Sequence, residues 1–213
     1  MTGRFALVAL TLAWIAGLAA SGWHPHDRLT WWMEVAPALI ALPVLWWSMS
    51  PAAAPRFRLT TLALVLIGLH GLILMLGGAY SYARVPAGFA VQDWLALDRN
   101  PYDRLGHFMQ GFIPAIVLRE LLVRLGGLAR GALLAVVVLA CCLAVSAFYE
   151  LIEFAAAMML GQGAEEFLGT QGDPWDTQWD MLTCLIGAIS ALALLTRLHD
   201  RQIDRIQPPL YCH

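Results

Sequence analysis

Two polar segments of the sequence combine residue types that can do chemistry with spacings that bring those residues together. In the first, Asp103, His107 and Gln110 are separated by four and three positions, so they would share one face of a helix. In the second, Glu150 and Glu153 are three positions apart and would also point the same way. Imidazole and carboxylate groups held together in this manner can bind a divalent metal ion or move a proton.

A third segment, residues 169–180, is rich in acidic and aromatic residues. Asp176 and Asp180 are four positions apart and would face the same direction if this stretch is helical. Asp173 belongs to a Gly-Asp-Pro turn signal, and Trp175 is of a type that suits the interface between membrane and water. We expect Asp173 and Trp175 to lie at the mouth of any site that the other residues form.

The composition indicates where such a site would lie. Of the 213 residues, 60% are hydrophobic and only 13% are charged, and the mean hydropathy is +0.66. A soluble domain is about one quarter charged, so the chain is predicted to cross a membrane several times. This composition argues against a nucleic-acid-binding protein, a secreted disulfide scaffold and an ordinary cytosolic enzyme. Four cysteines without metal-type spacing are interpreted as small apolar residues: Cys141, Cys142, Cys184 and Cys212.

Six apolar runs approach the roughly 20 residues that a helix needs to span a bilayer. They cover residues 5–22, 31–49, 59–79, 105–122, 131–160 and 181–198. We therefore predict an all-α bundle of six transmembrane helices in residues 1–198 and a short cytoplasmic tail in residues 199–213. Arg4 before the first run imitates a signal peptide, but the run is long for one, and we expect an uncleaved helix. Apolar residues after the third run predict a short interfacial helix: Phe89, Trp94, Leu95 and Leu97.

The arginines predict the orientation, because basic residues concentrate at the cytoplasmic ends of membrane spans. With a cytoplasmic N-terminus, nine arginines lie inside and four outside, so both termini are expected in the cytoplasm. Three acidic residues then lie inside and twelve on the outer side. An outer face this acidic attracts cations and repels phosphate unless a metal ion intervenes. At the inner side, Arg119 and Glu120 are expected to form an ion-pair anchor, with Arg124 and Arg130 facing lipid phosphates.

In this topology the polar segments reach similar depths near the outer face, where buried carboxylates need compensation. An ionised Asp costs about 2.5–3.5 kcal/mol at the centre of a membrane helix. For Glu150 and Glu153 the compensation could come from Arg104, from a proton retained by one carboxyl group, or from a divalent cation. The same carboxylates could instead only fix the helix register by pairing with arginine and backbone amides.

If a metal ion is bound, one imidazole among oxygen ligands favours Mn, Fe or Zn. The candidate metal ligands are His107, Glu150, Glu153, Asp176 and Asp180. Glu150 and Glu153 are also the candidates for a catalytic role. Asp103, Arg104 and Gln110 would support the site and bind the ligand together with Asp173 and Trp175, and Asp103 could orient the imidazole of His107.

The chain resembles the YjdF family of predicted bacterial inner-membrane proteins over almost its whole length. The resemblance rests on His24-Pro25-His26-Asp27-Arg28-Leu29-Thr30-Trp31, Gly77-Gly78-Ala79-Tyr80-Ser81-Tyr82-Ala83, Tyr102-Asp103-Arg104-Leu105-Gly106-His107-Phe108, Gln110-Gly111-Phe112, Arg119-Glu120, Ser146-Ala147-Phe148-Tyr149-Glu150-Leu151-Ile152-Glu153 and Phe167-Leu168-Gly169-Thr170-Gln171-Gly172-Asp173. It implies a multi-pass protein of the bacterial inner membrane. That family carries no assigned activity, so the resemblance implies no catalytic residue. Phe154 departs from the Trp expected after Glu153.

A shorter pattern is similar to VanZ-like membrane proteins, which are associated with resistance to glycopeptide antibiotics. The pattern consists of Asp103-Arg104-x-x-His107-Phe108, then Glu150 or Glu153, then Asp180 with Gly187. VanZ-like proteins usually carry Gln three positions after the Glu, where this chain has Glu153. The additional carboxylate favours a metal site, and the similarity implies at most a role in the cell envelope.

Three functions remain open from the sequence. The leading expectation is an inner-membrane protein with an acidic pocket, open to the outer face, that binds an envelope lipid, an ion or a small ligand. The alternatives are an intramembrane metal-dependent hydrolase or transferase acting on a lipid-linked substrate, with the metal activating water, and a secondary transporter. The lack of a visible internal repeat counts against the transporter.

Overall fold

The computed structural model of the chain describes residues 2–53, 57–160 and 170–206, which form seven α-helices and no strand. The helices are α1 (Thr2–Trp23), α2 (Arg28–Ser48), α3 (Thr61–Tyr80), α4 (Pro86–Leu95), α5 (Tyr102–Arg124), α6 (Ala132–Leu160) and α8 (Asp176–Ile206). The all-α prediction is confirmed. Several positions used in the sequence analysis lie outside the described residues: Arg56, Glu165, Glu166, Cys212 and residues 167–169 and 207–213.

Five of the described helices are long and apolar enough to cross a membrane, namely α1, α2, α3, α6 and α8. Each coincides with one of the predicted apolar runs. The fourth predicted run corresponds to α5, which has 23 residues but carries charged side chains at both ends. Those charges keep α5 outside the hydropathy range of the other five helices. The chain is therefore an all-helical membrane protein with five candidate spans and one additional long, more polar helix.

Local signals in the sequence account for where several helices begin. The Asp27 carboxylate accepts a hydrogen bond of 2.7 Å from the backbone amide of Thr30 and caps α2. This bond lowers the pKa of Asp27, because it stabilises the ionised carboxylate. Pro86 occupies the first turn of α4, where its missing N–H is not needed. Pro37 and Pro43 lie inside α2, which continues through both.

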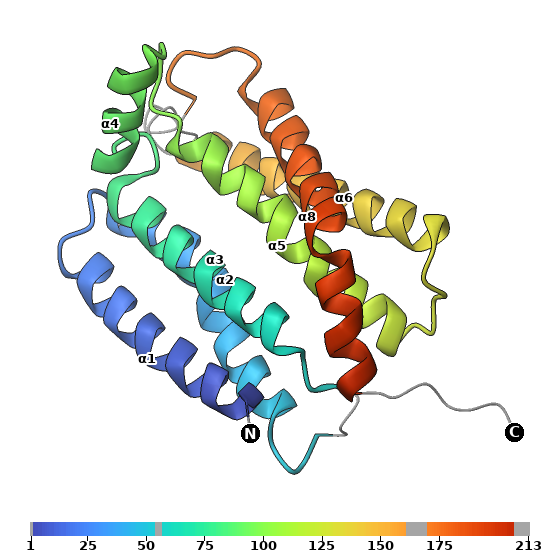
Figure 1. Cartoon of the computed structure of the whole chain (residues 1–213). Coiled ribbons are helices and arrows are strands. Elements are labelled where there is room, and N and C mark those ends of the chain that lie inside the picture. Colours follow the sequence, from blue (N-terminus) through green and yellow to red (C-terminus); the bar gives the residue numbers. More distant parts are fainter. Residues whose placement is uncertain (1, 54–56, 161–169, 207–213) are drawn as a thin grey trace, which may run out of the picture.

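The long helices form two groups of three (Figure 1). In the first group α1, α2 and α3 pack around a core that includes Trp14, Leu64 and Met75. In the second group α5, α6 and α8 pack around a core that includes Ile113 and the buried Cys184. Contacts between α3 and α5 join the two groups, so α5 lies at the centre with neighbours on three sides.

Two glycines allow α5 and α8 to pack very closely. A methyl group added at Gly111 of α5 would overlap the carbonyl oxygen of Cys184 on α8. A methyl group added at Gly187 of α8 would overlap the carbonyl oxygen of Phe108 on α5. Small residues permit this kind of backbone approach between membrane helices. The reciprocal contact fixes the first turns of α5 beside the first turns of α8, where the polar segments lie.

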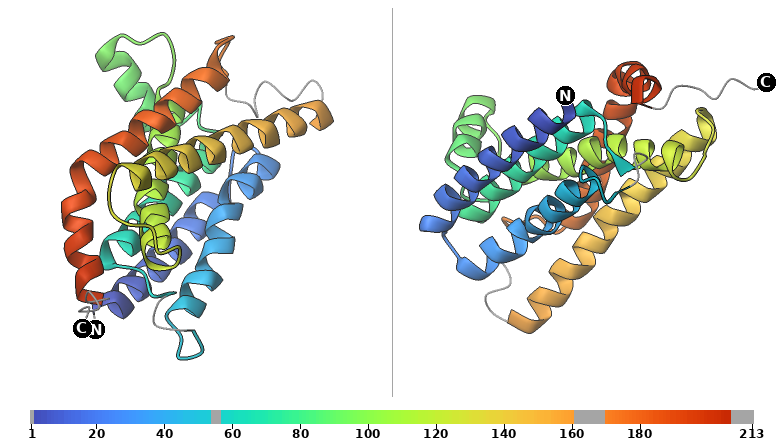
Figure 2. Two further views of the ribbon diagram at one scale, coloured as in Figure 1. Left: turned by 90° about the vertical axis from the view of Figure 1, so that its right-hand side faces the viewer. Right: turned by 90° about the horizontal axis from the view of Figure 1, so that it is seen from below.

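The two ends of the bundle differ. The α4 end carries α4 and the first turns of α5 and α8, and the terminal end carries the start of α1 and the last turns of α8 (Figure 1). Helix α4 is the short helix expected in this region, and it exposes Phe89, Trp94 and Leu95. Helix α8 continues past Leu198 to Ile206, so the first part of the expected tail is helical. Helix α6 crosses the bundle obliquely (Figure 2).

Candidate functional site

An ion-pair network joins the polar segments at the α4 end of the bundle. Arg99, in the connection before α5, donates to Asp176 Oδ1 at 2.5 Å and to Asp103 Oδ2 at 3.1 Å. One helical turn further on, Arg104 pairs with Asp180 and donates to Asp176 Oδ1 at 2.7 Å. The two arginines thus connect the first turn of α5 with the first turns of α8.

Arg104 does not pair with Glu150 or Glu153, which the sequence analysis considered as its partners. In addition to Asp176 and Asp180, it contacts Asp173 Oδ2 at 3.2 Å. The physical reason is the close packing of α5 on α8, which brings the guanidinium group to the aspartates of α8 before it can reach α6. Asp173 and Asp176 therefore belong to the ion-pair network, whereas the Trp175 side chain is 64% exposed.

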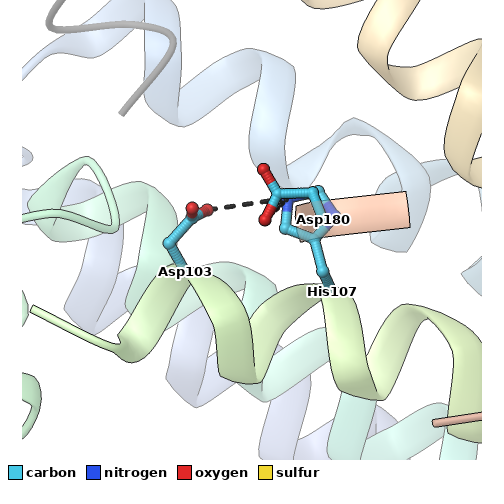
Figure 3. Close-up of side chains that lie close together, drawn as sticks. All are labelled: Asp103, His107 and Asp180. Carbon is cyan, nitrogen blue, oxygen red and sulfur yellow. Dashed lines mark ion pairs between the residues drawn. The ribbon is translucent and has the colours of Figure 1, made fainter. Parts of the chain in front are cut away.

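His107 faces two carboxylates from different helices (Figure 3). Its Nε2 lies 3.6 Å from Asp103 Oδ1, one turn earlier on α5, and 3.7 Å from Asp180 Oδ1 on α8. Its other ring nitrogen, Nδ1, lies 3.0 Å from Gln110 Oε1. All three ionisable residues are buried, and their potential ligand atoms lie within 4.8 Å of one another. Among the described residues, this trio is the set of His, Cys, Asp and Glu side chains whose ligand atoms lie close enough together to share one metal ion.

The two glutamates of α6 have different surroundings. Glu150 is 9% exposed, its Oε1 has no hydrogen-bond partner, and Thr177 of α8 lies within hydrogen-bonding reach. Glu153, one turn further, lines a cavity together with Asp103 and His107. Of the predicted metal ligands, His107 and Asp180 thus lie together, and Asp103 joins them. Asp176, another predicted ligand, is paired with Arg99 and Arg104.

The cavity has a volume of about 400 Å³ and lies between the two helix groups. Ionisable and hydrogen-bonding side chains line the end nearest α4, and these are Thr30, Glu34, Ser81, Tyr82, Asp103, His107, Gln110, Tyr149 and Glu153. Farther from α4 the walls are mostly apolar, and they include Ala38, Ala41, Ile67, Pro114, Val117, Leu118 and Val145. His70 lines the middle on α3. The cavity is therefore amphipathic along the direction of the helices.

The sequence analysis missed the contribution of Glu34, Tyr82 and Tyr149 to this polar end. Glu34 is the one acidic residue within the second apolar run, and Tyr82 lies three positions after the end of the third run. An acid isolated in an apolar run is a signal that could have identified Glu34. Tyr149 stands four positions before Glu153 on α6, and this helical spacing could have identified it. Tyr82 has no such spacing to the other site residues, so only the fold brings it to the cavity.

A second polar cluster lies near the terminal end of α5. Glu120 is fully buried and accepts hydrogen bonds from Thr60 N at 2.8 Å, Arg124 Nη1 at 2.6 Å and His199 Nε2 at 3.0 Å. Arg119 donates to Asp200 Oδ1 at 2.8 Å. The expectation that Arg124 faces lipid phosphates is wrong, because the buried Glu120 carboxylate draws this guanidinium group inward. The cluster connects α3, α5 and α8 and contains no atom of the cavity wall.

Comparisons with known proteins agree with the fold. The family described as "Predicted membrane protein (DUF2238)" matches residues 6–201 of the chain. The "Inner membrane protein YjdF" of Escherichia coli (strain K12) is 54% identical over 199 residues, which cover 92% of this chain and 91% of that protein. No solved structure matches the chain significantly. Neither description names a ligand, a substrate or a reaction.

Proposed function

The chain belongs to the DUF2238 family of membrane proteins, and we propose that it is a multi-pass protein of the bacterial inner membrane that binds one amphipathic, lipid-like molecule. The single observation that carries the proposal is the amphipathic cavity. Its polar end would hold the head of the ligand near the outer face, and its apolar part would hold a hydrocarbon chain. The sequence left three classes of ligand open, namely a lipid, an ion or a small ligand. Of these the cavity favours a lipid.

The dimensions of the cavity support a ligand with a chain. From Gly106 to Leu118, both of which line the cavity, α5 rises about 18 Å at roughly 1.5 Å per residue. The volume of about 400 Å³ falls within the range of sites for small ligands. Over this length the wall changes from carboxylates to Val117 and Leu118, so a molecule with a polar head and an apolar tail matches it better than an inorganic ion does.

Access from the membrane is supported by the arrangement of α2 and α6. Ala38 and Ala41 of α2 and Val145 and Tyr149 of α6 line the cavity, yet α2 and α6 make little direct contact with each other. Between these helices a chain from the bilayer can enter sideways without crossing the polar network. Binding by lateral entry needs no aqueous channel and is compatible with an apolar inner wall.

The charge of the polar end favours a particular head group. Glu34, Asp103 and Glu153 line it, and the positively charged Arg104 does not. An amine or hydroxyl head can donate to these carboxylates, whereas a bare phosphate would be repelled. We therefore expect a ligand whose head carries a cationic or hydrogen-bond-donating group.

The proposed topology has six spans, with α5 as the sixth and both termini in the cytoplasm. The polar residues of α5 do not exclude it from the membrane, because its charged side chains are paired. Arg104 and Arg119 pair with aspartates of α8, and Arg124 pairs with Glu120 within α5. The arginine distribution supports the cytoplasmic assignment of the terminal end. In this orientation the polar part of the cavity opens toward the outer face.

The two other functions considered from the sequence have narrower support. A metal-dependent hydrolase or transferase requires a metal ion beside the bound lipid, for which the Asp103, His107 and Asp180 trio is the candidate. A transporter requires polar groups along a path to both faces. In the described residues the wall beyond Pro114 is apolar, which favours retention of a ligand over its passage through the protein.

Mass spectrometry of the full-length protein extracted from its native membrane tests the proposal. We expect one lipid species to be bound per chain and to be enriched over its abundance in the surrounding bilayer. Ala41→Phe places a ring inside the apolar part of the cavity and should abolish this adduct. Ile40→Phe is the matched control, because Ile40 directly precedes Ala41 on α2, is 67% exposed and does not line the cavity.

A co-purified lipid profile equal to that of the bulk membrane would overturn lipid binding. An adduct that survives Ala41→Phe in a folded protein would also overturn it, because the chain would then lie elsewhere. Glu34→Gln and Glu153→Gln examine the head group separately, and they should reduce retention of lipids with an amine head more than retention of neutral lipids.

A further inference from the structure

The hydrogen bond of Gln110 defines the state of the His107 imidazole. Gln110 Oε1, 3.0 Å from Nδ1, can only accept, so the shared hydrogen belongs to Nδ1. In the neutral imidazole Nε2 then carries a lone pair, and in the protonated imidazole it carries a second hydrogen. In both states Nε2 faces Asp103 and Asp180. A lone pair is repelled by two carboxylates, and a metal cation among the three groups would relieve this repulsion.

The distances around Nε2 agree with a bound cation better than with hydrogen bonds. The separations of 3.6 Å to Asp103 Oδ1 and 3.7 Å to Asp180 Oδ1 are longer than a hydrogen bond allows. Ligands about 2.0–2.1 Å from a tetrahedral metal ion lie roughly 3.3–3.4 Å from one another. A small inward movement of three side chains would therefore complete three sides of a metal site.

The charge of the surrounding residues also favours a bound cation. Four aspartates share the two guanidinium groups of Arg99 and Arg104 around this point, and the buried Glu150 adds a fifth carboxyl group. Glu150 interacts electrostatically with His107 and Asp103, and its Oε1 is buried without a hydrogen-bond partner. An unpaired carboxylate oxygen at this depth is costly unless a donor or a cation satisfies it, and Glu150 belongs to a third helix, α6.

We propose that Asp103, His107 and Asp180 bind one divalent transition-metal ion, Zn²⁺ or Mn²⁺, with Glu150 as a further ligand. The imidazole ligand favours these ions over Mg²⁺ and Ca²⁺. Gln110 and Arg104 orient the imidazole and the Asp180 carboxylate from outside the site. Asp103 and His107 also line the cavity, so the ion borders the polar end, but the metal site does not depend on a bound lipid.

The test uses full-length protein without a polyhistidine tag, purified in mild detergent and treated with a chelator. Zn²⁺ or Mn²⁺ alone is then added, unbound metal is removed, and the metal content is measured. We expect one equivalent per chain. Electron paramagnetic resonance of the Mn²⁺-loaded protein should show hyperfine coupling to a single imidazole nitrogen.

Gln110→Leu removes only the hydrogen bond that orients His107, and it should lower the metal affinity about 10- to 100-fold. His107→Gln and Asp180→Asn each remove a ligand and should lower the affinity further. His70→Gln is the matched control, because His70 lines the same cavity on α3 outside the acidic trio and should leave the affinity unchanged.

Wild-type protein that retains no metal after loading would overturn the proposal, whatever the variants do. Metal retained with unchanged nitrogen coupling in His107→Gln would overturn it as well. Because metal content and lipid retention are separate readouts of the same sample, failure of the metal site is distinguishable from failure of lipid binding.

Discussion

Glu120 shows how a single buried acid can organise its surroundings. Its side chain is inaccessible to solvent and is satisfied by the backbone and hydroxyl of Thr60, by Arg124 and by His199. These partners come from the start of α3, the same helix α5 and the end of α8. Removing one member of a buried ion pair is more costly than never having had the pair, because the other groups keep their charge without a partner.

We expect Glu120→Ala to destabilise the protein by about 3–5 kcal/mol, which lowers the midpoint of thermal unfolding in detergent by many degrees. Asp204→Asn provides the control, since it removes an exposed ion pair with Arg130 and should leave the midpoint unchanged. A midpoint in Glu120→Ala equal to that of Asp204→Asn would contradict a structural role for this cluster.

At the residue scale, the sequence predicts which side chains are chemically important better than it predicts their partners. His107 and Asp180 were found from their types and from the depth of their helices. Arg99 was counted only as an outer arginine, because nothing in its spacing indicates that it reaches Asp176, which is 77 positions away. Arg124 was expected at the lipid surface because the burial of Glu120 is a property of the packed helices.

The contact between α5 and α8 is the structural basis of the site at the scale of whole helices. Gly111 and Gly187 each face a backbone carbonyl of the other helix, so the two backbones are nearly in contact. Only at this separation can Arg104 reach across to Asp180 and His107 face the same carboxylate. The polar network and the glycine contact are therefore two parts of one interface.

Gly187→Ala is expected to force α5 and α8 apart and to destabilise the protein by about 1–3 kcal/mol, despite the better helix propensity of Ala. The same change at Gly131 is the control, because no atom lies within 4 Å of a methyl group added there. Thermal unfolding of both variants measures the difference. If Gly187→Ala were as stable as Gly131→Ala, the close contact would not be needed for the fold.

At this scale the sequence predicted the positions of the long helices well. Each apolar run lies within a helix or within a few residues of one, because run length and hydropathy are local properties. The sequence could not predict the division into two groups of three or the cavity between them. Those features depend on which helix faces pack together, and helices that are apolar all round carry little periodic signal.

The proposed orientation of the whole molecule makes a prediction that does not depend on any ligand. With the terminal end in the cytoplasm, a fluorescent protein fused after Ile206 should be fluorescent, and a periplasm-dependent phosphatase fused there should be inactive. A cysteine placed at Leu97, before α5, should react with a membrane-impermeant thiol reagent added to intact cells. A cysteine at Leu125, after α5, should be protected, because α5 separates the two positions.

Labelling of both positions from outside would contradict α5 as a span, and phosphatase activity after Ile206 would contradict the cytoplasmic terminus. A cysteine at Trp94 in the exposed helix α4 is the positive control for outer labelling. All three substitutions are made in a background without the native cysteines, so that the signal reports only the introduced thiol.

The polarity of α5 has a consequence for how the protein is made. The chain emerges from the ribosome in order, and α5 reaches the insertion machinery well before α8. At that moment the guanidinium group of Arg104 has none of its aspartate partners from beyond residue 170. On its own α5 partitions poorly into hydrocarbon. With α5 as the proposed sixth span, biogenesis would require α5 to wait, sheltered by earlier helices or by a chaperone, until translation delivers α8 and the two helices enter the bilayer as a pair.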